Sequence, residues 1–192
     1  AEYALPSVGN APTTPGEYEY WNDGAAIFGD VTAIADGDVF VLCHPDADEA
    51  ILAHCDATHL YLSNGDDGRM LVKGTETAYT IVDTLGDFNG DPGSGWDVCG
   101  VDNATKDHTL VKKDRKGGNA DWDASRGTNA DDCDWLVKDN EDWTDLGKHC
   151  LDSQAEVAIT VNNTTGEVTV AENQTAVATV DATVTACKTL TY

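Results

Sequence analysis

Cysteine and histidine side chains offer this chain its most versatile chemistry, and one group of them lies close together in the sequence. The group consists of Cys43, His44, His54, Cys55 and His59. All five are residue types that bind Zn²⁺, but their spacing matches no familiar zinc motif. We prefer a disulfide between Cys43 and Cys55, with the neighbouring histidines in solvent.

The six cysteines together predict three disulfides, because their number is even and no CxxC pair occurs. Besides Cys43–Cys55, we pair Cys99 with Cys133, since each stands close to a tryptophan that a β-sandwich core would bury. We pair Cys150 with Cys187, the one cysteine that can tie the C-terminal segment to the rest of the chain. This pairing leaves no cysteine nucleophile, and we predict no catalytic activity.

Acidic side chains are in large excess, with 35 Asp and Glu against 11 Lys and Arg and a net charge of −24. Asp87, Asn89 and Asp91 have the alternate spacing that opens a calcium-binding loop, although Pro92 follows and Val98 stands where such a loop has its Glu. Calcium is therefore one interpretation, and a solvated acidic surface suited to a salty exterior is the other. No other cofactor is predicted.

Basic residues are few and clustered. Lys112, Lys113, Arg115 and Lys116 lie within five positions, and no Lys or Arg precedes Arg69. Such a charge distribution excludes nucleic-acid binding through phosphates. The cluster is either the solvated end of a hairpin or a patch for self-association, which would dock on the acidic surface of an identical subunit.

Several features predict a secreted, extracellular or cell-surface protein. No run of about 18 apolar residues is present, which predicts no membrane span, and residues 1–15 lack a signal-peptide pattern, as expected if an export signal has been removed. Asn-X-Ser/Thr triplets, which predict attached glycans or arise by chance in Thr-rich sequence, occur at Asn103, Asn162, Asn163 and Asn173.

The elements that position these groups are mostly short strands. Pro45 to His54 is the one stretch with a helical apolar stripe, and it must fold back if the cysteines on either side of it pair. Leu60 to Ser63 and Met70 to Lys73 predict a hairpin across residues 64–68. Alternation or β-branched residues predict further strands at Val39 to Leu42, Ala78 to Leu85, Thr109 to Lys113 and Asp134 to Lys138.

Residues 151–192 differ from the rest in composition, because they are rich in Val and Thr and contain no Trp. Alternation in Val157 to Val161 and in Val168 to Val170, with a polar turn between, predicts a hairpin. A further strand is expected from Val180 to Ala186. We therefore predict two domains, residues 1–150 and a β-rich extension at 151–192.

Residues 1–150 resemble the extracellular relatives of the lamin tail domain. The resemblance rests on segments in the same order along the chain: Gly37 to Val41, Ala50 to Leu52, Leu62 to Gly68, Gly93 to Val98, Thr105 to Val111 and Asp142 to Gly147. It implies an all-β, immunoglobulin-like antiparallel β-sandwich, here with one short helix, that serves as an accessory or interaction module without an active site.

One departure from this family concerns the N-terminus. The family domain opens with one or two strands before the segment that matches Ala4-Leu5-Pro6, and these strands are missing here, which leaves an exposed sheet edge. The Val- and Thr-rich segment can fill that edge in its own subunit or in a neighbour, which would give a polymer by strand addition.

The sequence supports two alternative functions. The first is a self-associating, non-catalytic structural or cell-surface protein that forms a homo-oligomer or filament. The second is a monomeric extracellular binding or anchoring module, for carbohydrate or calcium, clipped from a larger protein. A sugar-binding surface would use exposed tryptophans, whereas core positions are preferred for Trp21, Trp96, Trp122, Trp135 and Trp143.

Overall fold

The computed structural model describes residues 3–22, 27–28, 31, 33–35, 37–113 and 116–149, and the backbone of residues 157–160 and 181–184. The chain divides into two compact units, Ala1–Leu151 and Asp152–Tyr192, and each is described by itself. Strands predominate over helices, so the β-rich fold class is confirmed. Among the described residues no helix is long and apolar enough to cross a membrane.

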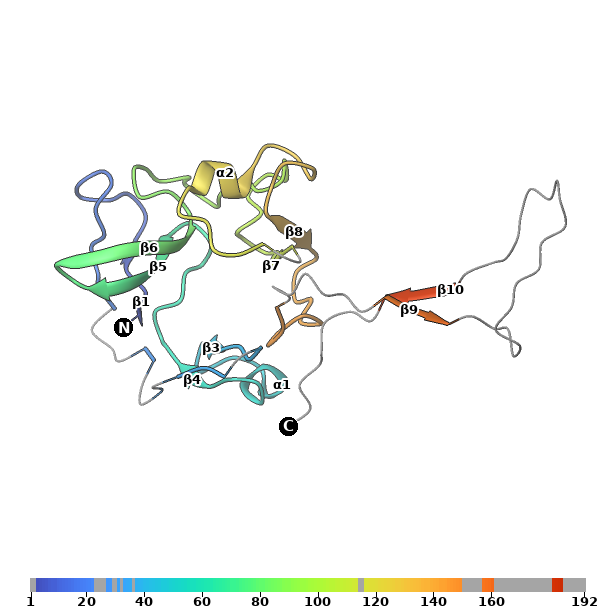
Figure 1. Ribbon diagram of the computed structural model, residues 1–192. Coiled ribbons are helices and arrows are strands. Elements are labelled where there is room, and N and C mark those ends of the chain that lie inside the picture. Colours follow the sequence, from blue (N-terminus) through green and yellow to red (C-terminus); the bar gives the residue numbers. More distant parts are fainter. Residues whose placement is uncertain are drawn as a thin grey trace, which may run out of the picture. The chain divides into compact units, whose positions relative to one another are not determined.

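The longest strands of the first unit form one hairpin, β5 (Gly68–Thr75) and β6 (Ala78–Leu85) (Figure 1). Both strands contain β-branched residues at their centres, which favour extended backbone. The other edge of β5 pairs antiparallel with β1 (Tyr3–Ala4) and β2 (Ser7–Val8). The N-terminal segment is thus held in a four-stranded sheet.

The predicted hairpin between Leu60 to Ser63 and Met70 to Lys73 is wrong. The Ser63 hydroxyl accepts hydrogen bonds from the backbone N–H groups of Gly65, at 2.9 Å, and Asp67, at 3.2 Å. These bonds close a turn before β5 begins, and no strand is found at residues 60–63. The strand β5 pairs instead with the residues that follow it, so the hairpin lies one element further along the chain.

A second antiparallel pair consists of β7 (Thr109–Lys112) and β8 (Trp135–Lys138). Both strands lie where the sequence predicts them. Between them lies α2 (Trp122–Arg126), which the prediction of one short helix missed. Asp121 caps this helix by accepting a hydrogen bond from the backbone N–H of Ala124 at 3.0 Å, and Gly127 ends it at a φ of 58°.

The third group combines β3 (Leu42–Cys43) and β4 (Ala57–Thr58), which pair in parallel, with α1 (Glu49–Leu52). The parallel pair departs from the wholly antiparallel sheets that were expected. The helix is shorter than predicted, because Asp48 caps it on the backbone N–H of Ala50 and the chain then turns back. This reversal brings the Cα atoms of Cys43 and Cys55 to 5.9 Å, within disulfide range.

Among the described residues of the first unit, two apolar clusters form the core. One contains Val8 and Val72 of the first sheet and Phe88, which follows β6, with Tyr18 and Trp21 packed against it. The other is built around the Cys99–Cys133 disulfide, and its remaining members are Val98, Ala104 and Trp122, with Leu85, Trp96, Leu110, Trp135 and Val137 packed against them. Leu85 of β6 and Leu110 of β7 both contact this second cluster, so it joins the two sheets.

In the second unit, β9 (Val157–Thr160) and β10 (Asp181–Val184) form an antiparallel ribbon. The register places Val157 opposite Val184 and Ile159 opposite Ala182. Successive residues of a strand belong to opposite faces, so residues 157, 159, 182 and 184, all apolar, share one face. The strand predicted at residues 168–170 lies outside the described residues.

Candidate functional site

A surface hollow lies beside β7, and we call it the β7 groove. It has a volume of about 350 Å³ and is lined by Thr109, Leu110, Val111 and Lys112 of β7, by Ile51, and by the wall residues Asp142, Trp143 and Asp145–His149. Side chains of successive strand residues point to opposite faces. A hollow that touches all four residues of β7 therefore lies along the edge of the strand.

The backbone of β7 is open on the groove side. The ladder with β8 continues in the bond from the N–H of Lys113 to the carbonyl of Asp134, at 2.9 Å. Hydrogen-bonded and non-bonded positions alternate in an antiparallel pair, so Leu110 and Lys112 point their N–H and C=O groups away from β8. Within the described residues these groups have no hydrogen-bond partner. The groove thus exposes two donors and two acceptors of an edge strand.

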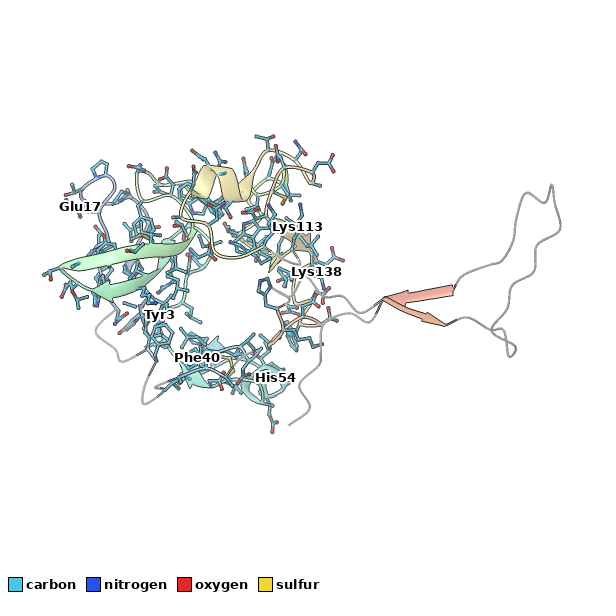
Figure 2. The ribbon with its side chains drawn as sticks, in the orientation of Figure 1. Tyr3, Glu17, Phe40, His54, Lys113 and Lys138 are labelled. Carbon is cyan, nitrogen blue, oxygen red and sulfur yellow. A yellow bond between two sulfur atoms is a disulfide. The ribbon has the colours of Figure 1, made fainter. Side chains whose placement is uncertain are left out.

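The wall of the groove is organised by Lys138 at the end of β8, labelled in Figure 2. Its ammonium group lies 2.5 Å from Oδ2 of Asp145, 3.2 Å from Oδ2 of Asp142 and 2.8 Å from Oγ1 of Thr144. The bond to Asp145 raises the pKa of Lys138, and Asp142 adds to the effect. Lys138 therefore holds together the loop of residues 142–145, which faces β7.

The lining of the groove suits an extended, largely uncharged chain. Leu110, Val111, Leu146 and Ile51 give it an apolar surface, and the side chain of Trp143 is 40% exposed. The charged lining residues are Lys112 and Lys148 against Asp142 and Asp145. Their charges cancel, so the groove is locally neutral on a strongly anionic chain. Exposed backbone groups with apolar pockets are the features used to add a strand to a sheet.

The basic cluster is largely occupied inside the chain. Lys112 pairs with Asp83 at 2.7 Å, and Lys113 donates to the carbonyl oxygens of Ala130 and Cys133, both at 2.7 Å. Lys116 lies 2.6 Å from Oδ1 of Asp134. The described lysines therefore make contacts within the fold, and Lys116 stays half exposed at a side-chain exposure of 50%. The self-association patch stays a prediction, and Arg115 lies outside the described residues.

Asp134 lies beneath this cluster with an exposure of only 5%. Burial acts to raise the pKa of its carboxyl group, but the hydrogen bond from Asn119 and the contact with Lys116 outweigh burial and lower the pKa. The carboxylate is therefore kept charged in the folded state, next to the Cys99–Cys133 disulfide.

The residues considered for calcium serve separate turns. Asp87 accepts hydrogen bonds from the backbone N–H of Asn89 at 2.9 Å and from its side-chain amide at 2.8 Å. Asp91 accepts one from the backbone N–H of Gly93 at 2.6 Å. Within the described part of the chain, no three His, Cys, Asp or Glu side chains form a group that could hold a metal ion. The calcium site stays a prediction without a structural counterpart.

The cysteines are brought together as pairs. Cys43 bonds to Cys55 and Cys99 to Cys133, and the Cα atoms of the second pair are 5.3 Å apart. The zinc alternative at Cys43 and Cys55 is wrong, because both thiols are used in a disulfide. Cys150 and Cys187 lie outside the described residues.

Asn103 of the glycosylation triplet is exposed, whereas Ala104 is buried and Thr105 makes hydrogen bonds within the fold. Asn103 stands in a turn at a φ of 53°. The Thr105 hydroxyl donates to the carbonyl of Gly65 at 2.5 Å and accepts from the backbone N–H of Trp96 at 2.7 Å. Asn162, Asn163 and Asn173 lie outside the described residues.

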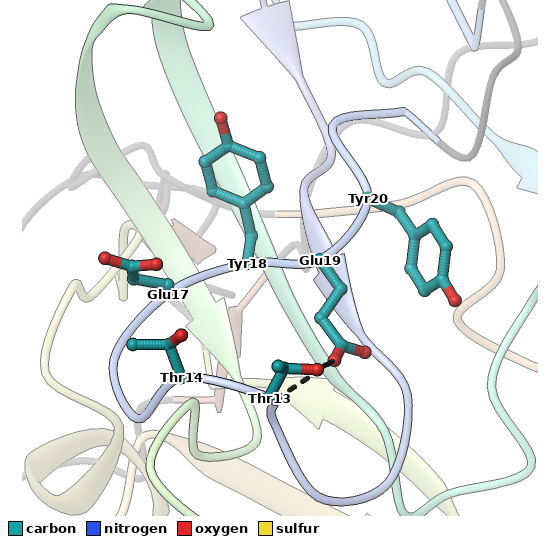
Figure 3. A pocket seen from close by; sticks show the side chains of 6 residues that line it. All are labelled: Thr13, Thr14, Glu17, Tyr18, Glu19 and Tyr20. Atoms are coloured by element: carbon teal, nitrogen blue, oxygen red, sulfur yellow. Dashed lines mark hydrogen bonds between the residues drawn. The ribbon is translucent and has the colours of Figure 1, made fainter.

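The aromatic side chains do not form a flat platform. Trp21, Tyr18 and Tyr79 pack at centroid distances of 5.4 to 6.1 Å, but their rings are tilted or edge-on. A shallow hollow is found at Thr13, Thr14 and Glu17–Tyr20, where Glu19 accepts a hydrogen bond from Thr13. Figure 3 shows Tyr18 and Tyr20 pointing in different directions, and Tyr20 is 53% exposed. Of the five tryptophans only Trp143 is exposed.

Searches against family models, curated protein sequences and solved structures found no match to this chain. The described residues by themselves define a β-rich, disulfide-bonded protein in which the edge of β7 is open. The resemblance to the lamin tail domain stays a prediction.

Sequence reasoning did not single out Leu110, Trp143 and Leu146 as parts of one site. The available signal was local: Asp142 and Thr144 flank Trp143, and Asp142 accepts hydrogen bonds from the Thr144 backbone at 3.0 Å and hydroxyl at 2.5 Å. An Asx turn of this kind predicts that Trp143 is presented on a loop. It does not predict which strand the loop faces.

Proposed function

We propose that this chain is a secreted, non-catalytic structural protein that self-associates through its C-terminal β-ribbon. The observation that carries the proposal is the register of β9 and β10, which puts four apolar residues on one face. An isolated two-stranded ribbon is marginally stable in water, and an apolar face stabilises it only when another surface covers it. A second copy of the chain is a surface that is always available.

Further support comes from the first unit. Two disulfides are typical of an oxidising, extracellular environment, and the absence of a membrane-crossing helix among the described residues is compatible with it. The two sheets, joined through the Cys99–Cys133 cluster, suit an immunoglobulin-like sandwich of the lamin-tail type. The proposal is of a non-catalytic role, and it is supported by the disulfides: all four described cysteines are bonded, so none of them is a free thiol nucleophile.

The test compares two variants of the full chain. Ile159→Asp places a charge on the apolar face of the ribbon, and Thr183→Asp in β10 places the same charge on the other face as the matched control. We expect the unaltered chain and Thr183→Asp to associate with rising concentration in light scattering, and to form ordered assemblies in negative-stain electron microscopy. Ile159→Asp is expected to weaken association about 10- to 100-fold, since burial of one such side chain contributes about 1.5–3 kcal/mol. An unaltered chain that stays monomeric at all concentrations contradicts the proposal.

A second candidate, a monomeric carbohydrate-binding module, is favoured by the hollow at Thr13–Tyr20. It combines hydroxyl and carboxylate groups with the exposed ring of Tyr20, the kind of surface on which a sugar stacks. Titration calorimetry with a panel of oligosaccharides tests it: binding that Tyr20→Ala removes supports a binding module, and heats that Tyr20→Ala leaves unchanged contradict this site.

A further inference from the structure

We infer that the β7 groove is the acceptor site for self-association and that β9 of a second copy adds to β7 as a new edge strand. The inference rests on the proposed function and names the surface it uses. Two independent features carry it. One is an edge strand whose outer backbone groups have no partner among the described residues and which lies beside an apolar wall, and the other is a ribbon of this same chain with an apolar face.

The backbone of the groove matches a strand of this length. Both β7 and β9 have four residues. Leu110 and Lys112 each offer one N–H and one C=O toward the groove, so an added strand can form a short ladder on the side that β8 does not use. Main-chain bonds of this kind give affinity, and side chains in pockets give specificity.

The charges of the two surfaces permit the contact. Copies of a chain with a net charge of −24 repel one another over most of their surface. The positive charges of the lysines that line the groove balance the negative charges of its aspartates. The sequence of β9 is Val-Ala-Ile-Thr, which carries no charge. β10 carries Asp181, so β9 is the strand that enters the groove with the smaller desolvation cost.

The apolar residues are also matched. Leu110, Leu146 and the half-exposed Trp143 line the groove. A strand paired to β7 directs alternate residues to one side of the sheet, and the alternate residues of β9 are Val157 and Ile159. The inferred contact thus covers the ribbon face that holds the four apolar residues on which the proposed function rests. We assign it to a second copy because the proposed function is association between copies of this chain.

Photocrosslinking in the full chain tests this assignment. The change Trp143→p-benzoylphenylalanine puts the probe in the groove wall, and Leu136→p-benzoylphenylalanine is the control on β8, with a similar native exposure of 47% against 40%. Mixing ¹⁴N- and ¹⁵N-labelled chains before illumination separates links between copies from links within one. We expect mixed-isotope products that join the Trp143 probe to the peptide of residues 157–167, which cleavage after Glu156 and Glu167 releases with β9 but without β10, and no such products from the Leu136 probe.

Substitution supplies the second readout. Trp143→Asp is expected to weaken association about 10- to 100-fold in light scattering, while Leu136→Asp leaves it within about twofold, with equal melting temperatures for the two variants. Association that Ile159→Asp weakens but Trp143→Asp does not, or crosslinks confined to single chains or to other segments, overturns the groove assignment and leaves the proposed function standing. Absence of any association of the unaltered chain overturns both.

Discussion

The ammonium group of Lys112 lies 2.7 Å from Oδ1 of Asp83 and 4.2 Å from the centre of the Trp135 ring. Asp83 belongs to β6 and Lys112 to β7, so this contact joins the two sheets. The Lys112 side chain is only 9% exposed, and the same Asp83 oxygen accepts the backbone N–H of Asn119 at 2.9 Å. Such a pair is sensitive to the loss of one partner, because the other charge remains partly buried.

Lys112→Met keeps the aliphatic stem but removes the charge. We expect a loss of roughly 1–3 kcal/mol in the free energy of unfolding, the usual cost of an unpaired polar group at a mostly buried site. Urea unfolding measures it. Asp83→Asn and the double variant complete a cycle, and a coupling energy near zero would contradict a direct Lys112–Asp83 interaction.

The two described disulfides are expected to differ in their contribution. The Cys99–Cys133 bridge closes a sequence separation of 34 residues and the Cys43–Cys55 bridge one of 12, which corresponds to roughly 4 and 3 kcal/mol in the chain-entropy model. Cys99→Ala with Cys133→Ala should therefore lower the midpoint of urea unfolding more than Cys43→Ala with Cys55→Ala. The core position of the first bridge adds to the difference. The reverse order would contradict this ranking.

Stability should fall in acid because of Asp134. Its pKa is lowered in the folded state, so its contribution is complete above the unfolded value of about 3.9 and is lost as the pH falls through the lower folded value. Asp132 and Asp142, which hydrogen bonds from Thr128 and Thr144 hold at lowered pKa values, act in the same direction. We expect the melting temperature to drop below about pH 4.

Asp134→Asn provides the control for this pH dependence. The variant should be less stable than the unaltered chain at pH 7, and its stability should change less between pH 5 and pH 3, because residue 134 no longer titrates. Parallel pH profiles for the two chains would show that Asp134 does not contribute.

Added salt should strengthen self-association. Raising NaCl from about 0.1 M to about 1 M shortens the Debye length from about 10 Å to about 3 Å and so screens the repulsion between copies with a net charge of −24. The contact inferred at the groove is largely uncharged, so the added salt weakens its attraction only a little. Analytical ultracentrifugation across this range measures the effect, and association that weakens with salt would favour docking through the basic residues near Lys116.

Local sequence signals predicted the strands but not their partners. Alternation and β-branched residues located β6, β7 and β8, whose sequences have strong local preferences for extended backbone. The hairpin at β5 was assigned to the wrong neighbour because a single hydroxyl, that of Ser63, ends the preceding segment in a turn. The helix α2 was missed although Asp121 and Gly127 carry its capping signals, since five residues are too few for an apolar stripe.

The groove could not be predicted, because its parts come from distant positions. Its wall at residues 142–149 faces β7, and neither segment shows locally that the other is near. The basic residues were interpreted as a surface patch for the same reason: Asp83 lies 29 positions from Lys112, and the carbonyl of Cys133 lies 20 positions from Lys113. Tertiary contacts decide whether a lysine faces solvent.

The internal contacts of Lys112 and Lys113 also affect the charge of the protein surface. With these two cations occupied within the chain, the surface that dissolved ions meet is richer in carboxylates than the amino-acid count suggests. Any assembly of many copies would concentrate these carboxylates into a dense polyanion, which holds a layer of small cations around it. The material properties of such an assembly would then depend on the ionic composition of its surroundings.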